Sequence, residues 1–361
     1  MFMKKQLMGL AACALILSSC SQNQEIENYE QLNREEVRLA PYVNKSKASV
    51  MDLPAMKDAN YSGFKVYALQ HAPVMNGEVI VDGGLLTNYA DGTYDFMTNL
   101  VEKYQNNVWS HGADKYYWPE TDALSFFAVA PAEGNSISKG NAMTIPVTIK
   151  DNVADQIDIL AASVLNKTKS TVTSSNGQVD FTFKHILSRI GFKARVADNQ
   201  NLKFKITAIS FTYGTEIVKD GVFTFEKDGI GTIVAGETLH GATTSNIGIM
   251  DTKGTIISST TPVQINANDA YLMLMPQDKS GNLMSMTISY HVAVAGDNYS
   301  PTEKTVTINI PVMKYEQGKA YGYNLILSNE TGDGLLEIKF GVTDVTSWNE
   351  ETTPTTPPAG N

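Results

Sequence analysis

The side chains most often used for chemistry are few in this chain and lie far apart. It has five histidines, His71, His111, His185, His240 and His291. No two of them have metal-ligand spacing, and no nucleophile motif, phosphate-binding loop or calcium loop is present. His185 lies near Phe183 and Ile186, where a histidine with one hydrogen-bond partner at a domain junction is a simpler interpretation than a catalytic base. We therefore expect no enzyme, no cofactor and no metal ion.

The two cysteines both lie near the N-terminus. Lys4 and Lys5 precede an apolar run from Leu7 to Leu17 that is too short to span a bilayer. The stretch Leu17-Ser18-Ser19-Cys20 then resembles the lipobox of bacterial lipoproteins, in which the signal is cut before the cysteine and the cysteine is lipidated. The resemblance implies a signal peptide over residues 1–19 and a lipid on Cys20. An ordinary signal peptide followed by a chance cysteine is the alternative.

Removal of the signal would change the composition in two ways. No cysteine follows Cys20, so disulfides and thiolate metal sites are excluded from the rest of the chain. With Lys4 and Lys5 gone, 26 basic residues face 38 acidic ones, which argues against nucleic acid as a partner. Beyond Cys20 no apolar run approaches the ~20 residues of a membrane helix. We expect a protein tethered to the outer membrane by its lipid.

Four aromatic residues lie close together at Trp109, Tyr116, Tyr117 and Trp118. Such a group could form a flat platform for a sugar ring. Aromatic side chains of a strand also commonly fill the core of a β-sandwich, and we favour this second interpretation.

Most of the chain from Phe64 onward has the apolar–polar alternation of β-strands. Residues 124–130 are apolar on both faces, which predicts a central strand. Within residues 202–213 the apolar–polar alternation shifts by one residue, which predicts a β-bulge. Residues 99–118 fit a helix or a strand, and their aromatic ending favours the strand. Many short strands with turns between them predict an all-β protein made of two antiparallel β-sandwich domains in series.

The length of the mature chain exceeds that of most single cores, so two domains are expected. The polar stretch from Ser170 to Gly177 is the best linker candidate. We therefore predict an N-terminal sandwich over residues 48–177 and a C-terminal sandwich over residues 178–348. Residues 20–47 would form a lipidated spacer with a first strand, and the Thr/Pro-rich residues 349–361 a disordered tail.

The two ends of the mature chain each carry a candidate strand. Near the N-terminus, Val37, Leu39 and Val43 would lie on one face of a short strand. A polar loop with Lys45 and Lys47 follows, and its composition is typical of a site that a protease can enter. The last predicted strand has its apolar residues on one face, at Leu336, Ile338, Phe340 and Val342.

Several short segments resemble the fimbrillin-like proteins. Each is weak alone, but their order and spacing extend over nearly the whole mature chain. They are Tyr117-Trp118-Pro119 with Leu124–Ala128, Asp155–Ala161, Phe183–Ile190, Met275-Pro276-Gln277 and the closing Trp348.

The resemblance implies a lipoprotein precursor of a type V pilus, with two transthyretin-like sandwiches. In pilin subunits of this family a protease of the outer membrane removes the first strand, and the C-terminal strand of another subunit fills the groove by β-augmentation. The first strand with Val37, Leu39 and Val43 would be the one displaced. The strand with Leu336, Ile338, Phe340 and Val342 would be the donor. The partners would be other pilus subunits, and the location the cell surface.

The processing site departs from the family pattern. The family's protease resembles an arginine-specific one, whereas the candidates here are Lys47, Lys45 and Arg38, and Arg38 lies inside the strand. Either processing uses a lysine, or the protein is an anchor or tip subunit that keeps its strand and lipid. A different class of function is a stand-alone, lipid-anchored protein that binds a glycan or peptide with the aromatic segment. A ligand on a host or bacterial surface is left open in each case.

Overall fold

The computed structural model describes residues 34–43, 53–172, 176–198, 202–212, 218–226, 232–235, 244–247, 255–265, 271–278, 283–293, 298–311, 314–328 and 337–347. Cys20, Lys45, Lys47, Leu336 and Trp348 lie outside these ranges. The described chain is mostly strand, with short helices at α2 (Leu53–Met56) and α3 (Lys169–Val172) and a 3₁₀ turn at Val153–Asp155. The prediction of a β-rich protein is confirmed. No helix within these ranges is long and apolar enough to cross a membrane.

The first sheet has seven strands. Its order is β1 (Arg38–Val43), β11 (Gln178–His185), β10 (Leu160–Lys167), β7 (Ala123–Ala130), β2 (Phe64–His71), β5 (Thr93–Gln105) and β6 (Val108–Ser110). Every residue of β7 is buried, as the apolar residues 124–130 predict for a central strand. Residues 99–118, which fit both a helix and a strand, contain the end of β5 and the whole of β6. Asn106 and Asn107, with φ angles of 51° and 66°, close a tight hairpin between these two strands.

A four-stranded sheet covers one face of the first sheet. Its order is β15 (Thr232–Ala235), β14 (Asp220–Thr224), β9 (Met143–Thr148) and β8 (Ser138–Lys139). Leu69 and Phe127 of the first sheet pack in one apolar cluster with Ile145 and Phe223 of the second. A small hairpin, β3 (Met75–Asn76) with β4 (Val79–Ile80), lies in the loop that joins β2 to β5.

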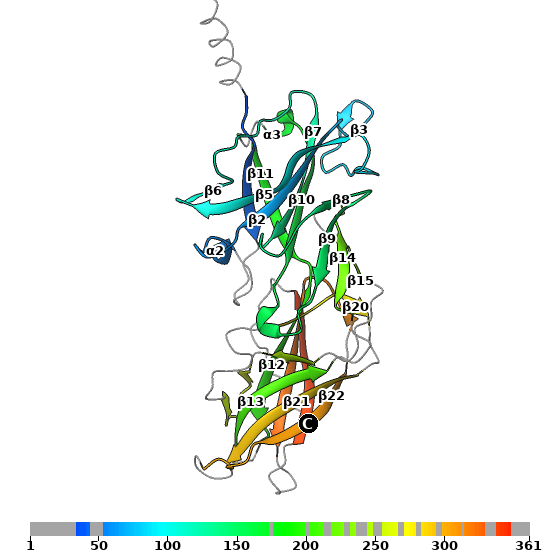
Figure 1. The fold of residues 1–361 in the computed structure, drawn as a ribbon. Helices are drawn as coiled ribbons and strands as arrows, with labels where there is room; N and C mark the ends of the chain where they lie inside the picture. The colour runs from blue at the N-terminus through cyan, green and yellow to red at the C-terminus, as the bar shows by residue number, and fades with distance from the viewer. Residues whose placement is uncertain are drawn as a thin grey trace, which may run out of the picture.

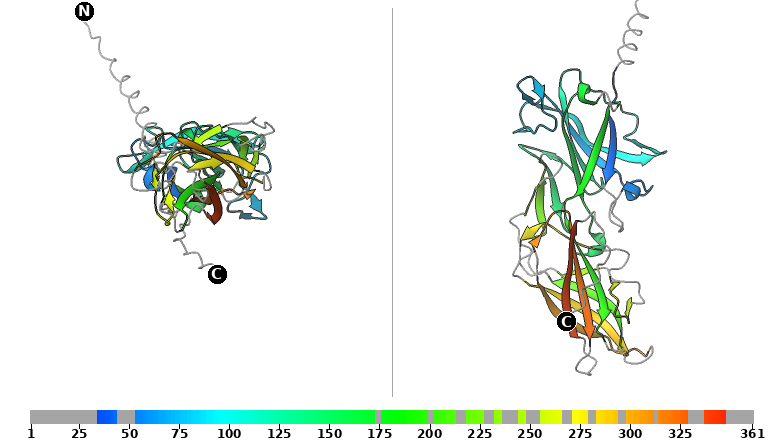
Figure 2. Two further views of the ribbon diagram at one scale, coloured as in Figure 1. Left: turned by 90° about the horizontal axis from the view of Figure 1, so that it is seen from below. Right: turned by 180° about the vertical axis from the view of Figure 1, so that it is seen from behind.

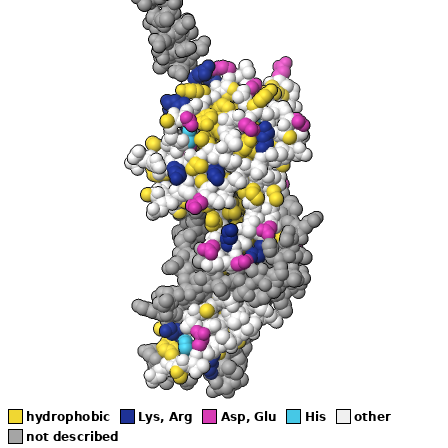
Figure 3. Space-filling view, in the orientation of Figure 1, with side chains coloured by type: hydrophobic (Ala, Val, Ile, Leu, Met, Phe, Trp, Pro, Cys, Tyr) yellow, Lys and Arg dark blue, Asp and Glu magenta, His cyan; other side chains and the backbone are white. Residues whose placement is uncertain are grey.

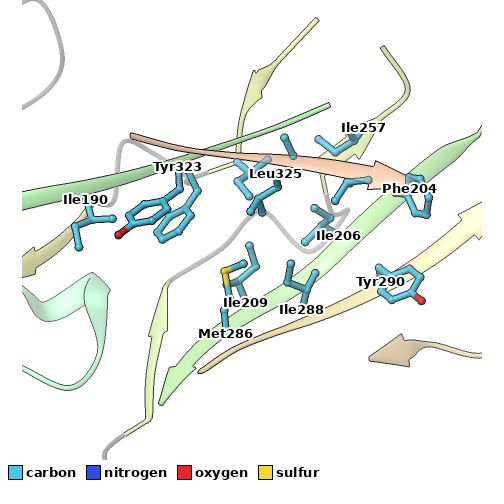
Figure 4. Close-up of a cluster of buried hydrophobic side chains, with 14 of the residues drawn as sticks. Ile190, Phe204, Ile206, Ile209, Ile257, Met286, Ile288, Tyr290, Tyr323 and Leu325 are labelled. Carbon is cyan, nitrogen blue, oxygen red and sulfur yellow. The ribbon is translucent and has the colours of Figure 1, made fainter. Parts of the chain in front are cut away.

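Two further sheets enclose a second core (Figure 4). One has β18 (Val263–Gln264), β12 (Ser188–Val196), β24 (Lys319–Ser328) and β25 (Glu337–Ser347), and β19 (Leu272–Leu274) also pairs with β12. The other has β16 (Thr244–Ile247), β13 (Lys203–Thr212), β21 (Leu283–Ala293) and β22 (Lys304–Pro311), and β17 (Thr255–Ile257) also pairs with β13. A two-stranded sheet of β20 (Gln277–Asp278) and β23 (Lys314–Tyr315) completes the described strands. The register of β13 shifts between Ile206 and Ala208, which confirms the predicted bulge.

The sheets form two groups along one long axis (Figure 1; Figure 2, right). The hairpin β3–β4 lies at one end, and β21 and β22 lie at the other. Three described strands from beyond residue 177 belong to the first group: β11 pairs with β1 and β10, β14 pairs with β9, and β15 pairs with β14. The division of the chain into domains at residue 177 stays a prediction.

Candidate functional site

The first strand, β1, lies at the edge of the seven-stranded sheet. It runs parallel to β11 in a six-residue register from Arg38 opposite Gln178 to Val43 opposite Phe183. On its other side β11 is in register with β10 at two residues only, Lys184 and His185. Along residues 178–183, β1 is therefore the only described strand in register with β11.

Apolar side chains of the first strand enter the core. Val37 and Leu39 are 1% and 4% exposed, and both pack in a cluster that includes Phe181, Phe183 and Trp118. Burying an aliphatic side chain of this size contributes about 1.5–3 kcal/mol. The backbone of Val43 is paired with Phe183, while its side chain lies outside the described part. Two of the three residues expected on the inner face are thus buried in the core.

Residues 35–37, residues 116–118 and Gly177 together form what we call the start clamp. Val37 N–H donates to the Tyr116 carbonyl at 2.8 Å, and Trp118 N–H donates to the Glu35 carbonyl at 3.0 Å. The Gly177 carbonyl accepts from the backbone N–H of Arg38 and from the indole Nε1–H of Trp118, each at 3.1 Å. The start clamp fixes the point at which the chain enters the sheet.

Gly177 is required by the geometry of the start clamp. Its φ angle is +74°, in the left-handed region that favours glycine. A Cβ atom at this position would lie 2.3 Å from the carbonyl oxygen of Glu36. The backbone of residue 36 can therefore approach closely only because residue 177 has no side chain.

The aromatic segment serves the core and the first strand. Trp118 is buried, with its ring edge-on to Phe126 at 5.8 Å. Trp109 packs on Phe64 at 5.3 Å, and Tyr116 on Phe96 at 5.6 Å. The buried ring of Trp118 is not available as part of a flat platform for a sugar.

A buried carboxyl group lies next to the start clamp. Glu102 of β5 is buried and its carboxyl group is hydrogen-bonded to Nδ1 of His111 at 2.9 Å. The Nε2–H of His111 donates to the Asp114 carbonyl at 2.9 Å, and the His111 ring contacts the Tyr116 ring at 5.5 Å. Burial raises the pKa of Glu102 to about 7, and the hydrogen bond from His111 opposes that rise. The pair is a titratable group in contact with a residue that holds β1. Sequence reasoning missed it, since Glu102 lies in β5 and His111 follows β6, and the pairing of these two strands brings the side chains together.

Several segments that carry the family resemblance meet where the two groups of sheets join. The buried His185 donates from Nδ1 to the carboxylate of Asp158 at 2.9 Å. Ser188 Oγ–H donates to the Glu316 carbonyl at 2.8 Å, and Gly318 N–H donates to the Leu187 carbonyl at 2.9 Å. The histidine was expected to be hydrogen-bonded at a junction, but its partner Asp158, 27 residues away, was not identified.

Two glutamines of the same segments extend these contacts. Gln156 Oε1 accepts from the backbone N–H of Met273 at 2.7 Å. Gln277 accepts from Val218 N–H at 3.0 Å and donates to the Val218 carbonyl at 3.1 Å. In the described ranges, no three histidine, cysteine, aspartate or glutamate side chains come together in a way that could hold a metal ion. These polar side chains join segments that lie far apart in the sequence.

The last strand, β25, lies at the edge of a different sheet from β1. It is antiparallel to β24 along its whole length, with Ile338 opposite Leu327, Phe340 opposite Leu325 and Val342 opposite Tyr323. Those three β24 residues are buried in the second core. On its other side, β24 is in register with eight residues of β12. The structure therefore does not bring the two candidate exchange strands together within one chain.

Comparison with known proteins gives consistent matches. A family model described as fimbrillin-like matches residues 59–348. The fimbrium subunit Fim1C of Phocaeicola vulgatus is 26% identical over 248 residues, which cover 63% of this chain and 62% of that protein. The chain thus aligns with less than two thirds of that relative. The crystal structure of a fimbrial protein from Bacteroides vulgatus has the same fold, with a TM-score of 0.63 and 18% identity over 88% of this chain and 100% of the other.

Proposed function

Because this chain belongs to the fimbrillin-like family, we propose that it is the surface lipoprotein precursor of a type V fimbrial subunit. The family is a structural one, so the protein is a fimbrial building block and not an enzyme. Assembly by strand exchange is supported above all by the pairing of β11, whose residues 178–183 have no described strand in register besides β1. After loss of β1, residues 178–183 would therefore be available to pair with a strand of another subunit.

The fold behind this proposal is two transthyretin-like sandwiches in series. We place the end of the first sandwich after β11, because β11 belongs to the seven-stranded sheet. The β14–β15 hairpin would also belong to the first sandwich, since it packs Phe223 against the first sheet.

The bounds of β1 support a cut after one of the two lysines. This strand ends at Val43, so cleavage after Lys45 or Lys47 would separate the whole strand, with the lipid on Cys20, from the rest. Cleavage after Arg38 would leave residues 39–43 paired with β11. We therefore favour the two lysines. The groove left behind would offer the pockets of Val37 and Leu39 and the unpaired main chain of β11.

The candidate donor is the strand that contains Leu336, Ile338, Phe340 and Val342. Its side chains alternate at the two-residue spacing that a strand needs to fill successive pockets. It lies at the edge of its sheet, and β24 would keep its pairing with β12 after β25 had left. Subunits of one or several kinds would join in this way into an adhesive fibre at the cell surface.

Binding of a donor peptide tests the proposal directly. A labelled peptide of residues 335–345 is added to the intact protein and to protein trimmed with trypsin at Lys45 or Lys47. We expect the peptide to bind only the trimmed form. In the absence of peptide, the trimmed protein should form fibres and the intact protein should not. A peptide with Ile338→Asp and Phe340→Asp is the matched control. Trimmed protein that binds neither peptide and stays monomeric at high concentration would contradict assembly by strand exchange.

The protein isolated from its native cell distinguishes a stalk subunit from an accessory one. A stalk subunit would be released and lack residues 20–47, whereas an anchor or tip subunit would keep its lipid and first strand. Metabolic labelling with a palmitate analogue should mark the wild-type precursor and not the Cys20→Ser variant. An unlabelled wild-type protein would contradict the lipid anchor.

A further inference from the structure

We propose that the β3–β4 hairpin is a docking surface for the next copy of this chain in the fibre. This inference rests on the proposed function and adds to it a contact outside the exchanged strand.

The hairpin and the loop that follows it expose large apolar side chains. Met75 is 46% exposed, Val79 69% and Leu85 41%. Single exposed apolar residues are normal on protein surfaces, but a group within residues 75–85 is not explained by the fold of the monomer. Figure 3 shows apolar side chains on the surface of this half of the molecule, interspersed with charged ones.

The base of the hairpin is fixed from inside the protein. The fully buried Asn166 donates from Nδ2 to the carbonyls of Val74 and Val81, at 3.0 and 2.7 Å, and its Oδ1 accepts from Val74 N–H at 2.9 Å. Asn166 N–H itself donates to Ser125 Oγ at 3.0 Å, and that hydroxyl is hydrogen-bonded to Nε2 of His71 at 2.8 Å.

A second contact fixes the chain just after the hairpin, where Lys167 forms an ion pair with Asp82. At its tip the register leaves Gly77 and Glu78 as the turn, and Gly77 has the positive φ, 64°, that a two-residue hairpin requires. An exposed apolar loop held this firmly needs little further ordering when it binds a partner.

The place of the hairpin in the molecule indicates the occupant. It lies at the end of the long axis beyond the first group of sheets, the end at which β1 begins (Figure 1). The opposite end of this group is occupied by the second group of sheets from the same chain (Figure 2, right). If a neighbouring subunit inserts its strand in place of β1, the rest of that subunit must therefore lie at the end of the molecule that carries the hairpin.

The test compares three proteins after trimming: wild type, the double variant Met75→Asp with Val79→Asp, and Ile256→Asp. Ile256 is the matched control, because it is 51% exposed and lies in β17 of the second group. We expect all three to melt alike before trimming, to be trimmed alike and to bind the donor peptide alike. Fibre formation, followed by light scattering and sedimentation, should fall at least tenfold for the double variant and remain near wild type for Ile256→Asp.

Each other outcome decides against the inference. If the double variant forms fibres as fast as wild type, the hairpin does not contact the next subunit. If its fibres are normal but no longer bind cells, the occupant is a surface ligand and the inference is wrong. If trimmed wild type neither forms fibres nor binds the donor peptide, the proposed function itself fails, and the hairpin proposal with it.

Discussion

The first and last described strands, β1 and β25, are both sheet edges but differ in what they leave behind. β1 is parallel to β11 over six residues, and most of β11 has no second partner in the described chain. β25 is antiparallel to β24 over ten residue pairs, but β24 also pairs with β12 over eight. Loss of β1 therefore leaves residues 178–183 of β11 with no other described strand in register, whereas loss of β25 leaves β24 paired with β12.

This difference separates the two roles that strand exchange requires. A strand whose neighbour stays paired can be donated without dissolving its own sheet. When a strand leaves and its neighbour has no other partner, the neighbour favours binding of a replacement strand. Its main-chain groups would otherwise stay unpaired and its apolar pockets open, and both raise the free energy.

The largest effect should appear in hydrogen exchange after each strand is removed. We expect amide protection of residues 178–183 to fall about a thousandfold, or ~4 kcal/mol, in freshly trimmed protein kept dilute. Residues 320–327 should keep most of their protection in a chain that ends at Glu330, because β12 still pairs with them. Addition of the donor peptide should restore protection of residues 178–183. Equal losses in the two strands would remove the distinction between acceptor and donor.

Leu39→Ala should destabilise the intact monomer by about 2–4 kcal/mol, because it removes a buried side chain that β1 supplies to the core. After trimming, variant and wild type are the same molecule, so the difference in melting temperature should disappear. Arg38→Ala, an exposed neighbour in the same strand, is the control and should have little effect. A difference that survived trimming would mean that β1 had not left.

Glu102→Gln should change the pH dependence of stability on the β1 side of the molecule. The folded pKa of Glu102 is raised by burial from 4.5 to about 7, so the folded state binds this proton more tightly than the unfolded state does. Its contribution is present in full below pH ~4.5 and is lost as the pH rises through about 7, with a total of at most ~3 kcal/mol.

Urea unfolding of wild type and Glu102→Gln between pH 4 and 8 measures this contribution. The stability of wild type should fall relative to the variant across that range. The exposed Glu133→Gln is the control and should run parallel to wild type. Parallel curves for all three proteins would show that folding does not raise the pKa of Glu102.

Gly177→Ala should have the smallest effect, about 1–2 kcal/mol in the intact monomer, because the new Cβ would meet the Glu36 carbonyl and the φ angle is positive. Gly92→Ala is matched in φ, at +67°, but its Cβ would meet nothing within 4 Å. The difference in melting temperature between the two variants reports the contacts of the new Cβ with residues 35 and 36 and with Trp118. Trimming should reduce the cost of Gly177→Ala, because residues 35 and 36 leave and only the Trp118 Nε1 atom, at 3.2 Å, stays close to the new Cβ. An undiminished difference after trimming would mean that Gly177 is not part of the start clamp.

The sequence alone determined that most of the chain is strand and which faces of several of the longer strands are buried. The alternation along β21, the doubly apolar β7 and the phase change within β13 all appear in the structure where the sequence predicts them. These features are local, because side-chain direction in a strand repeats every two residues whatever the neighbouring strand is. The burial of Val37 and Leu39 follows from the same rule.

Only the tertiary structure decided which strands are partners. Nothing in the alternation of β1 indicates that it pairs in parallel with β11, about 140 residues later, or that β14 returns from the second group to β9. Alternation fixes a face, but any strand with a free edge can supply the same main-chain hydrogen bonds. The partner is selected by long-range fit, such as the approach of residue 36 to Gly177 and the bond of Asp158 to His185. The strand exchange that we propose for β1 relies on the same property.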